Sequence, residues 1–112
     1  EVTSTDISKV PTFTPMTVRP SVKNKDAVER AMVREYPPLL RDAGIGGTVQ
    51  VHFYVDEEGK VVNTLVNTSS GYEAMDEAAL KVANIIEFTP ALNREKRVAV
   101  WISLPITFTS KF

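Results

Sequence analysis

His52 is the only histidine in the chain of 112 residues, and the chain contains no cysteine. A typical zinc site needs more histidine or cysteine ligands, and a serine–histidine–aspartate arrangement would need His52 as its base. The stretch Ser69–Ser70–Gly71 lacks the G-x-S-x-G pattern of a nucleophile elbow, and its place before a predicted helix indicates capping and turn residues. The sequence therefore predicts no catalytic residues, no metal site and no bound cofactor.

Two other clusters resemble ligand sites only in their composition. The acidic residues 56–58 lack the spacing of an EF-hand loop, and such residues commonly occupy the solvated tip of a hairpin. The glycines of residues 44–47 are followed by a predicted strand, whereas a phosphate-binding loop needs a Lys-Ser/Thr pair at the start of a helix. Both clusters are interpreted as turns.

Trp101 is the single tryptophan, and the alternation of its segment puts it on the strand face that the core does not use. One interpretation is that a helix or the N-terminal segment covers it, or that it lies exposed on its own. The other is that it contacts a partner, because tryptophan is enriched at binding hot spots. Both interpretations fit the sequence.

Hydrophobic spacing predicts the elements that position these residues. Asn24 is expected to cap the first helix with its side chain, and Pro37 ends that helix after Tyr36. Val62 and Val66 are expected to share one face of the returning strand with Thr64. The predicted elements are a short strand at 16–22, a helix ending at residue 36, a helical turn at 38–43 that buries Leu39, Leu40 and Ala43, strands at 48–55 and 60–68, a helix at 72–86 and a strand at 97–108.

This order, (β)-α-β-β-α-β, predicts an α+β two-layer sandwich. A three-stranded antiparallel sheet, with a short extra N-terminal strand, is covered on one face by two helices. Residues 1–14 are polar and interrupted by proline, so they are interpreted as a linker or lead-in to a domain spanning 15–112.

The composition excludes several classes of function. Apolar residues make up 43% and charged residues 24% of the chain, which is the balance of a globular domain. The formal net charge is −1 with scattered lysine and arginine, so the basic patch of a nucleic-acid-binding protein is absent from the sequence. No apolar run is long enough to span a membrane. Because the chain starts at Glu1 rather than Met, we expect it to be part of a longer protein.

Residues 24–108 closely resemble the C-terminal domain of TonB-type energy transducers. The resemblance depends on short motifs in a specific order and spacing. They are Tyr36–Pro37 at the helix break, Gly47 before the first long strand, Asp56 and Gly59 in the hairpin, Ser70–Gly71, the helix segment Asp76–Glu77–Ala78–Ala79 and the segment Phe88–Thr89–Pro90–Ala91.

The resemblance implies a periplasmic domain of a protein anchored in the inner membrane, with the anchor in a missing N-terminal part. In this family the domain binds the TonB box, a short segment of an outer-membrane receptor. A proton-driven motor complex in the inner membrane works through the transducer, so that siderophores, cobalamin or other nutrients enter. The resemblance thus implies receptor and motor partners, transport as the function, and no enzymatic activity.

The family binds the TonB box as an added strand beside its last strand. In this sequence that strand contains Pro105, and proline is confined to edge strands, strand starts and bulges. If the nitrogen of Pro105 points outward, Ala99, Trp101 and Ser103 also direct their backbone groups outward. About six main-chain hydrogen bonds and micromolar affinity are then expected. The predicted peptide-binding residues are Val98, Ala99, Val100, Trp101, Ile102, Ser103 and Pro105, and the resemblance places Glu35, Tyr36 and Pro37 near the receptor.

An open edge also permits self-pairing, so a weak homodimer is expected unless residues 16–22 cover the edge in the free state. Two alternatives to the TonB interpretation remain at this point. One is a TolA-like or other protein-binding module of the cell envelope. The other is an enzyme or small-ligand carrier, which would need a deep pocket with paired titrating groups.

Overall fold

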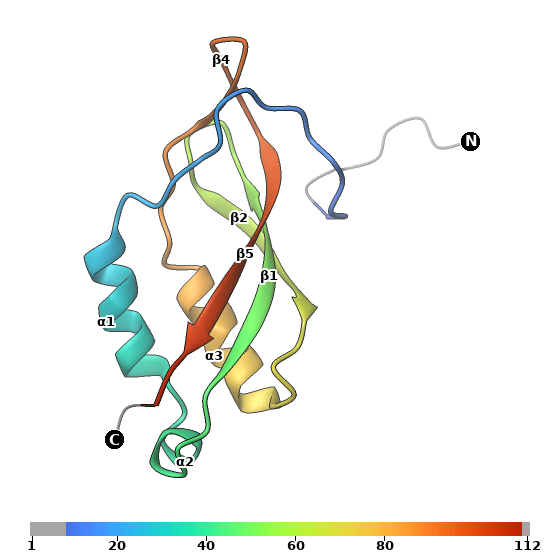
Figure 1. Cartoon of the computed structure of the whole chain (residues 1–112). Coiled ribbons are helices and arrows are strands. Elements are labelled where there is room, and N and C mark those ends of the chain that lie inside the picture. Colours follow the sequence, from blue (N-terminus) through green and yellow to red (C-terminus); the bar gives the residue numbers. More distant parts are fainter. Residues whose placement is uncertain (1–8, 111–112) are drawn as a thin grey trace.

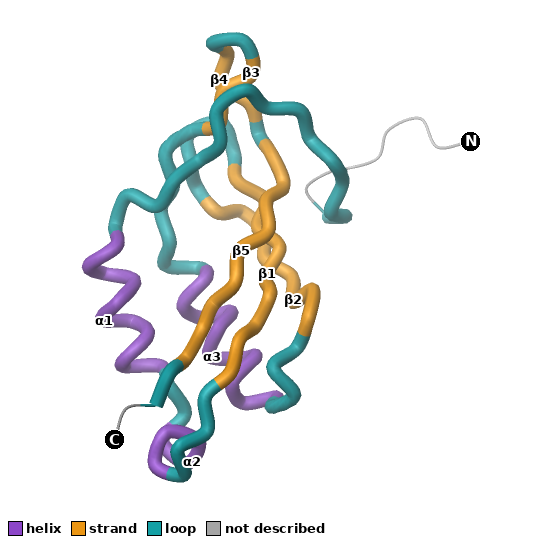
Figure 2. Tube along the Cα trace, in the orientation of Figure 1, coloured by secondary structure: helices purple, strands orange, loops and turns teal. Residues whose placement is uncertain are grey.

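Three antiparallel strands and two helices on one face of their sheet form the domain in the computed structural model, which describes residues 9–110 (Figures 1 and 2). Helix α3 packs against β1 and β2, and α1 packs beside α3. The predicted α+β two-layer sandwich is therefore confirmed. The helices are α1 (Lys25–Glu35), α2 (Pro38–Asp42) and α3 (Glu73–Ala83), and the strands are β1 (Gly47–Val55), β2 (Val61–Thr68), β3 (Ala91–Asn93), β4 (Lys96–Val98) and β5 (Val100–Phe108).

The sheet has the order β2-β1-β5, so β1 is central and β5 lies at an edge. The register between β1 and β5 runs without a break from the Gly47–Phe108 pair to the Val55–Val100 pair. Val49, Val51 and Phe53 of β1 are fully buried, as their alternation predicts. The last strand of the sheet therefore has only one neighbour in it.

The core lies between the sheet and α3. Met75, Ala79 and Val82 of that helix are fully buried, which confirms the predicted apolar stripe. Phe88 packs edge-on against Phe53, with ring centroids 5.6 Å apart. Each large side chain buried in this way contributes about 1.5–3 kcal/mol before conformational entropy is subtracted. Within residues 9–110 no helix is long and apolar enough to cross a membrane.

Asn24 does not cap α1 with its side chain, so that prediction was wrong. Its amide instead donates to the carbonyl of Ile85 at 2.8 Å and accepts from the N–H of Glu87 at 2.9 Å. One amide side chain carries a donor and an acceptor, and the backbone at residues 85–87 presents one of each. Asn24 thus ties the start of α1 to the segment after α3.

Helix α2 buries only part of what its sequence predicts. Leu39 is 86% exposed and Ala43 is also exposed, whereas Leu40 packs against the core. In a helix of one turn, adjacent residues point about 100° apart, so only one of the two leucines can face inward. Gly44 has a φ of 75° and closes this turn as expected.

Two elements near the C-terminus differ from the prediction. The segment predicted as one strand from 97 to 108 is divided between β4 and β5. Strand β4 pairs with β3 in a separate hairpin. The tip of this hairpin is formed by Arg94 and Glu95, with positive φ values of 54° and 73°. Turns of this kind favour glycine or asparagine, so Arg94 and Glu95 did not indicate a hairpin here.

Strand β2 also departs from the expected pattern at one residue. A register shift between Tyr54 and Val55 places Val61 opposite Val55. Val61 therefore packs against the core, while Val62 is 55% exposed, contrary to prediction. A β-bulge has this effect because it moves the next side chain to the other face.

The predicted strand at 16–22 does not join the main sheet. Val18 and Val22 instead form isolated bridges to Leu92 and Phe88. This segment therefore runs alongside residues 85–94 and then connects to α1 (Figure 1).

Candidate functional site

The open side of β5 is identified by two of its residues. Pro105 lies opposite Gln50 of β1. Because proline has no N–H, it fits a strand position whose nitrogen points away from the neighbouring strand. The N–H of Trp101 donates to Oγ1 of Thr14, at 2.9 Å, and therefore points away from β1. Backbone groups of alternate strand residues point to the same side. Ser103 and Thr107 consequently direct their N–H and C=O groups to the open side as well.

The open edge of β5, defined here as residues 103–107, offers two N–H donors and three C=O acceptors. The donors belong to Ser103 and Thr107, and the acceptors to these two residues and Pro105. Among residues 9–110, no residue outside the sheet forms a backbone hydrogen bond to these groups. Such unpaired groups form a template for an additional strand.

The opposite edge of the sheet, strand β2, is a poorer template. Its pairing with β1 has register shifts at both ends, between Gln50 and Val51 and between Tyr54 and Val55. Bulges of this kind twist an edge and interrupt the spacing of its free groups. Of the two edges, β5 is therefore the more regular one for strand addition.

The lead-in reaches the sheet at Trp101, which is one of the two interpretations that the sequence left open for this residue. Besides the hydrogen bond from its N–H to Thr14, the indole ring packs 5.3 Å from the ring of Tyr54 and 6.4 Å from that of His52. The side chain of Trp101 is only 6% exposed. These contacts support the interpretation in which the N-terminal segment helps to cover Trp101. Residues 1–8 lie outside the described part of the chain.

A hollow of about 310 Å³ lies beside this contact. Phe13 and its two preceding residues line one side of it, and His52, Trp101 and Ser103 line the other. Phe13 is 91% exposed, although it is a large apolar side chain next to the open edge. The hollow thus adjoins the first free residue of the edge, Ser103.

A second hollow, of about 280 Å³, lies at the other end of the open edge. Its lining includes Met32, Val33 and Tyr36 from the end of α1 and Thr107 from β5. Val33 is 75% exposed. A strand added to β5 would therefore extend from one hollow toward the other.

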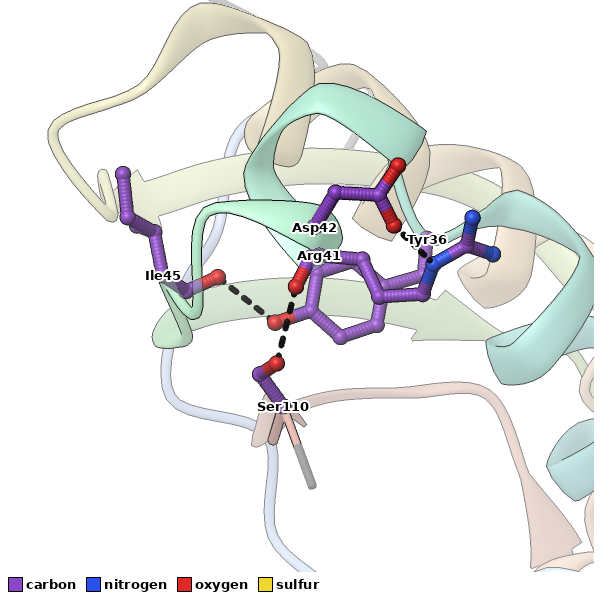
Figure 3. A network of polar contacts seen from close by, with 5 residues as sticks. All are labelled: Tyr36, Arg41, Asp42, Ile45 and Ser110. Atoms are coloured by element: carbon purple, nitrogen blue, oxygen red, sulfur yellow. Dashed lines mark hydrogen bonds and ion pairs between the residues drawn. The ribbon is translucent and has the colours of Figure 1, made fainter. Parts of the chain in front are cut away.

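Tyr36 holds the helix break in place (Figure 3). Its hydroxyl donates to the carbonyl of Ile45 at 2.6 Å. Its ring centroid lies 5.1 Å from that of Phe108. In the same region, the hydroxyl of Ser110 donates to the carbonyl of Arg41 at 2.9 Å. The corner between α1 and β1 is thereby tied to the end of β5.

The predicted receptor-proximal residues differ in their surroundings. Tyr36 is 7% exposed, so most of its surface is used within the fold. Glu35 forms an ion pair with Arg34 at 3.2 Å, and Pro37 is half-buried. Their predicted place near the receptor remains a prediction.

The structure separates the predicted peptide-binding residues into four groups. Val98 belongs to β4, where it pairs with Ala91, and Ala99 links β4 to β5. Val100 and Ile102 face the core. The backbone of Trp101 contacts the lead-in, which leaves Ser103 and Pro105 on the open edge together with Thr107, a residue missing from the prediction.

Asp76 closes the connection between β2 and α3. It accepts a hydrogen bond from the hydroxyl of Ser69, and two from Ser70, through the N–H at 2.9 Å and the hydroxyl at 2.8 Å. Burial alone would raise the pKa of Asp76, but these hydrogen bonds favour its charged form and hold the pKa below its ordinary value of 3.8. The arrangement explains the Ser-Gly and Asp motifs as structural elements.

Comparisons with known proteins find relatives of the sequence and of the fold. Residues 32–110 match the family model described as Gram-negative bacterial TonB protein C-terminal. The chain is 34% identical over 94 residues to Protein TonB of Vibrio cholerae, covering 83% of this chain and 38% of that protein. It is 39% identical over 74 residues to Protein tonB2 of Pseudomonas aeruginosa, covering 66% of this chain and 27% of that protein.

A solved structure also resembles the fold. The NMR solution structure of the Helicobacter pylori TonB-CTD has a TM-score of 0.52 and 25% sequence identity, covering 76% of this chain and 78% of that one. The chain therefore resembles that domain over most of its length, but spans well under half of the curated relatives that it matches.

Proposed function

Because the chain belongs to the Gram-negative TonB C-terminal family, we propose that it binds the TonB box of an outer-membrane receptor by strand addition. The observation that carries the proposal is the open edge of β5, with its outward groups at residues 103–107. The visiting segment would extend the sheet to four strands. The donors of Ser103 and Thr107 fix the spacing of its carbonyl groups.

The open edge offers fewer main-chain hydrogen bonds to a visiting strand than the sequence predicted. Two donors and three acceptors allow five main-chain hydrogen bonds, instead of about six, because Val98 and Ala99 lie outside β5 and the Trp101 N–H is bonded to Thr14. At about 0.5–1.5 kcal/mol each, they contribute about 2.5–7.5 kcal/mol before ordering costs. A dissociation constant of 1 μM requires about 8.2 kcal/mol. Side-chain contacts must therefore supply part of the affinity.

The proposed parent protein is an energy transducer. A segment before this domain would anchor it in the inner membrane and connect it to a proton-driven motor complex. The domain would work in the periplasm, where its grip on the receptor transmits force for the uptake of nutrients such as siderophores. Reversible main-chain pairing suits this role, because the domain must release the receptor after each cycle. The same edge would allow weak pairing between two copies of the domain.

An NMR titration of the ¹⁵N-labelled domain with TonB-box peptides tests the proposal. We expect the largest shift changes at residues 103–107, because this open edge borders the added strand. Changes centred on the β1–β2 hairpin at residues 56–59, or on β2, would contradict it. A scrambled peptide of the same composition is the control for non-specific binding.

A further inference from the structure

The hollow beside Ser103 has the position of a side-chain subsite for an added strand. Ser103 pairs with His52, and both side chains lie on the sheet face opposite the helices. A residue of a strand placed opposite Ser103 would direct its side chain to the same face, about 4.5–5.5 Å from Ser103 between Cβ atoms. That side chain would enter the hollow, because the small serine leaves space in front of His52 and Trp101.

The lining of the hollow favours an apolar occupant. Its lining contains no acidic or basic side chain other than His52, and most of its lining residues have largely apolar side chains, namely Pro11, Phe13, Trp101 and Ile102. Phe13 is 91% exposed, so an occupant that packs against it would remove a large apolar surface from water. The hollow, of about 310 Å³, can hold one large side chain.

We propose that this hollow binds one large aliphatic or aromatic side chain of the visiting strand, with Phe13 as its outer wall. The proposal rests on strand addition to β5. It assigns a recognition role to residues 11–13 of the lead-in, which precede the segment matched by the family model. The Thr14 hydrogen bond to Trp101 holds Phe13 at the edge. The subsite also provides side-chain contacts, which are needed in addition to the main-chain hydrogen bonds to reach micromolar affinity.

The test combines an alanine scan of a TonB-box peptide with two variants of the domain, measured by fluorescence anisotropy. Replacing the peptide residue in register with Ser103 by alanine should weaken binding about tenfold. Phe13→Ala should weaken binding of the parent peptide about three- to tenfold and leave the binding of that alanine peptide nearly unchanged. Val10→Ala is the control, because Val10 is a half-exposed residue of the lead-in outside the hollow.

A size exchange provides the second measurement. Ser103→Leu keeps the backbone donor but fills the hollow. It should therefore weaken binding of the parent peptide and restore binding of the alanine peptide. Such reversal requires contact between the two side chains and cannot arise from a general loss of stability. The thermal midpoint of each variant shows that it is folded.

The outcomes separate the subsite from the proposed function. If peptides shift the NMR signals of residues 103–107 but their affinities do not depend on Phe13, the proposed subsite is wrong and strand addition still stands. Tighter binding of every peptide to Phe13→Ala would show that the lead-in competes with the peptide, which also overturns the subsite. If no TonB-box peptide binds the domain, the proposed function fails and the subsite fails with it.

Discussion

Substitution of Ser103 by proline tests whether its outward N–H binds a visiting strand. Proline removes this donor, and its ring would face the partner at the open edge. The fold should tolerate the change, because the N–H of Ser103 points away from β1 and Pro105 already occupies an equivalent place two residues later. We therefore expect the free energy of unfolding to change by about 1 kcal/mol or less.

The expected loss of affinity follows from one unmade hydrogen bond. The carbonyl of the visiting strand opposite the new proline would be desolvated without a donor, at a cost of about 1–3 kcal/mol. This corresponds to binding that is about fivefold to 150-fold weaker. Ser103→Ala retains the N–H and is the matched reference for the serine side chain.

The assay is isothermal titration calorimetry of both variants with a TonB-box peptide, together with urea denaturation of each free domain. We expect the two variants to differ strongly in dissociation constant and to have similar stability. Equal affinities of the folded proline and alanine variants would refute it, because the donor of Ser103 would then play no part in binding.

Three further predictions concern the scaffold behind the edge. Tyr36→Phe removes the hydrogen bond to Ile45 and should lower the free energy of unfolding in urea by about 1–3 kcal/mol, and an unchanged value would show that water replaces it. Gly59→Ala should destabilise the domain by about 3 kcal/mol or more, because φ is 89° and the added Cβ would lie 1.9 Å from the carbonyl oxygen of Phe88; a wild-type thermal midpoint would exclude this contact. The carboxylate of Asp76 has a lowered pKa in the folded state, so its contribution is present above the ordinary value of 3.8 and is lost as pH falls through the lower folded value. Asp76→Asn should therefore reduce the free energy of unfolding at neutral pH, and its difference from the wild type should narrow as pH falls below the ordinary value of 3.8; parallel stability curves would contradict this.

The main sheet could be predicted from local sequence. Alternation in β1 and β5 identifies their buried faces because side chains of a strand alternate with a period of two. Pro105 indicated an edge, because proline cannot donate to a second neighbour. Glycine at position 59 indicated the hairpin turn, and its positive φ confirms that interpretation.

The hairpin of β3 and β4 could not be predicted in the same way. Arg94 and Glu95 adopt positive φ values without a glycine or asparagine to signal them. Its two strands have three residues each, too few for a periodic pattern. As a result, the predicted last strand began too early and included Val98 and Ala99.

The surroundings of the candidate site depend on contacts between distant residues. Thr14 and Trp101 are 87 positions apart, and Asn24 reaches residues 61 and 63 positions away. Neither residue type has a local pattern that specifies such a partner. Asn24 also fits a helix cap, so local reasoning preferred the wrong role for it. The wall formed by Phe13 was missed for the same reason, because no periodicity connects the lead-in to the sheet.

The most direct test of strand addition is a search for intermolecular nuclear Overhauser effects between the isotope-labelled domain and an unlabelled TonB-box peptide. We expect contacts from the amide protons of Ser103 and Thr107 to backbone protons of peptide residues four positions apart, because Pro105 between them has no amide proton. Contacts confined to β2 or to the helices, with none to these two amides, would contradict it.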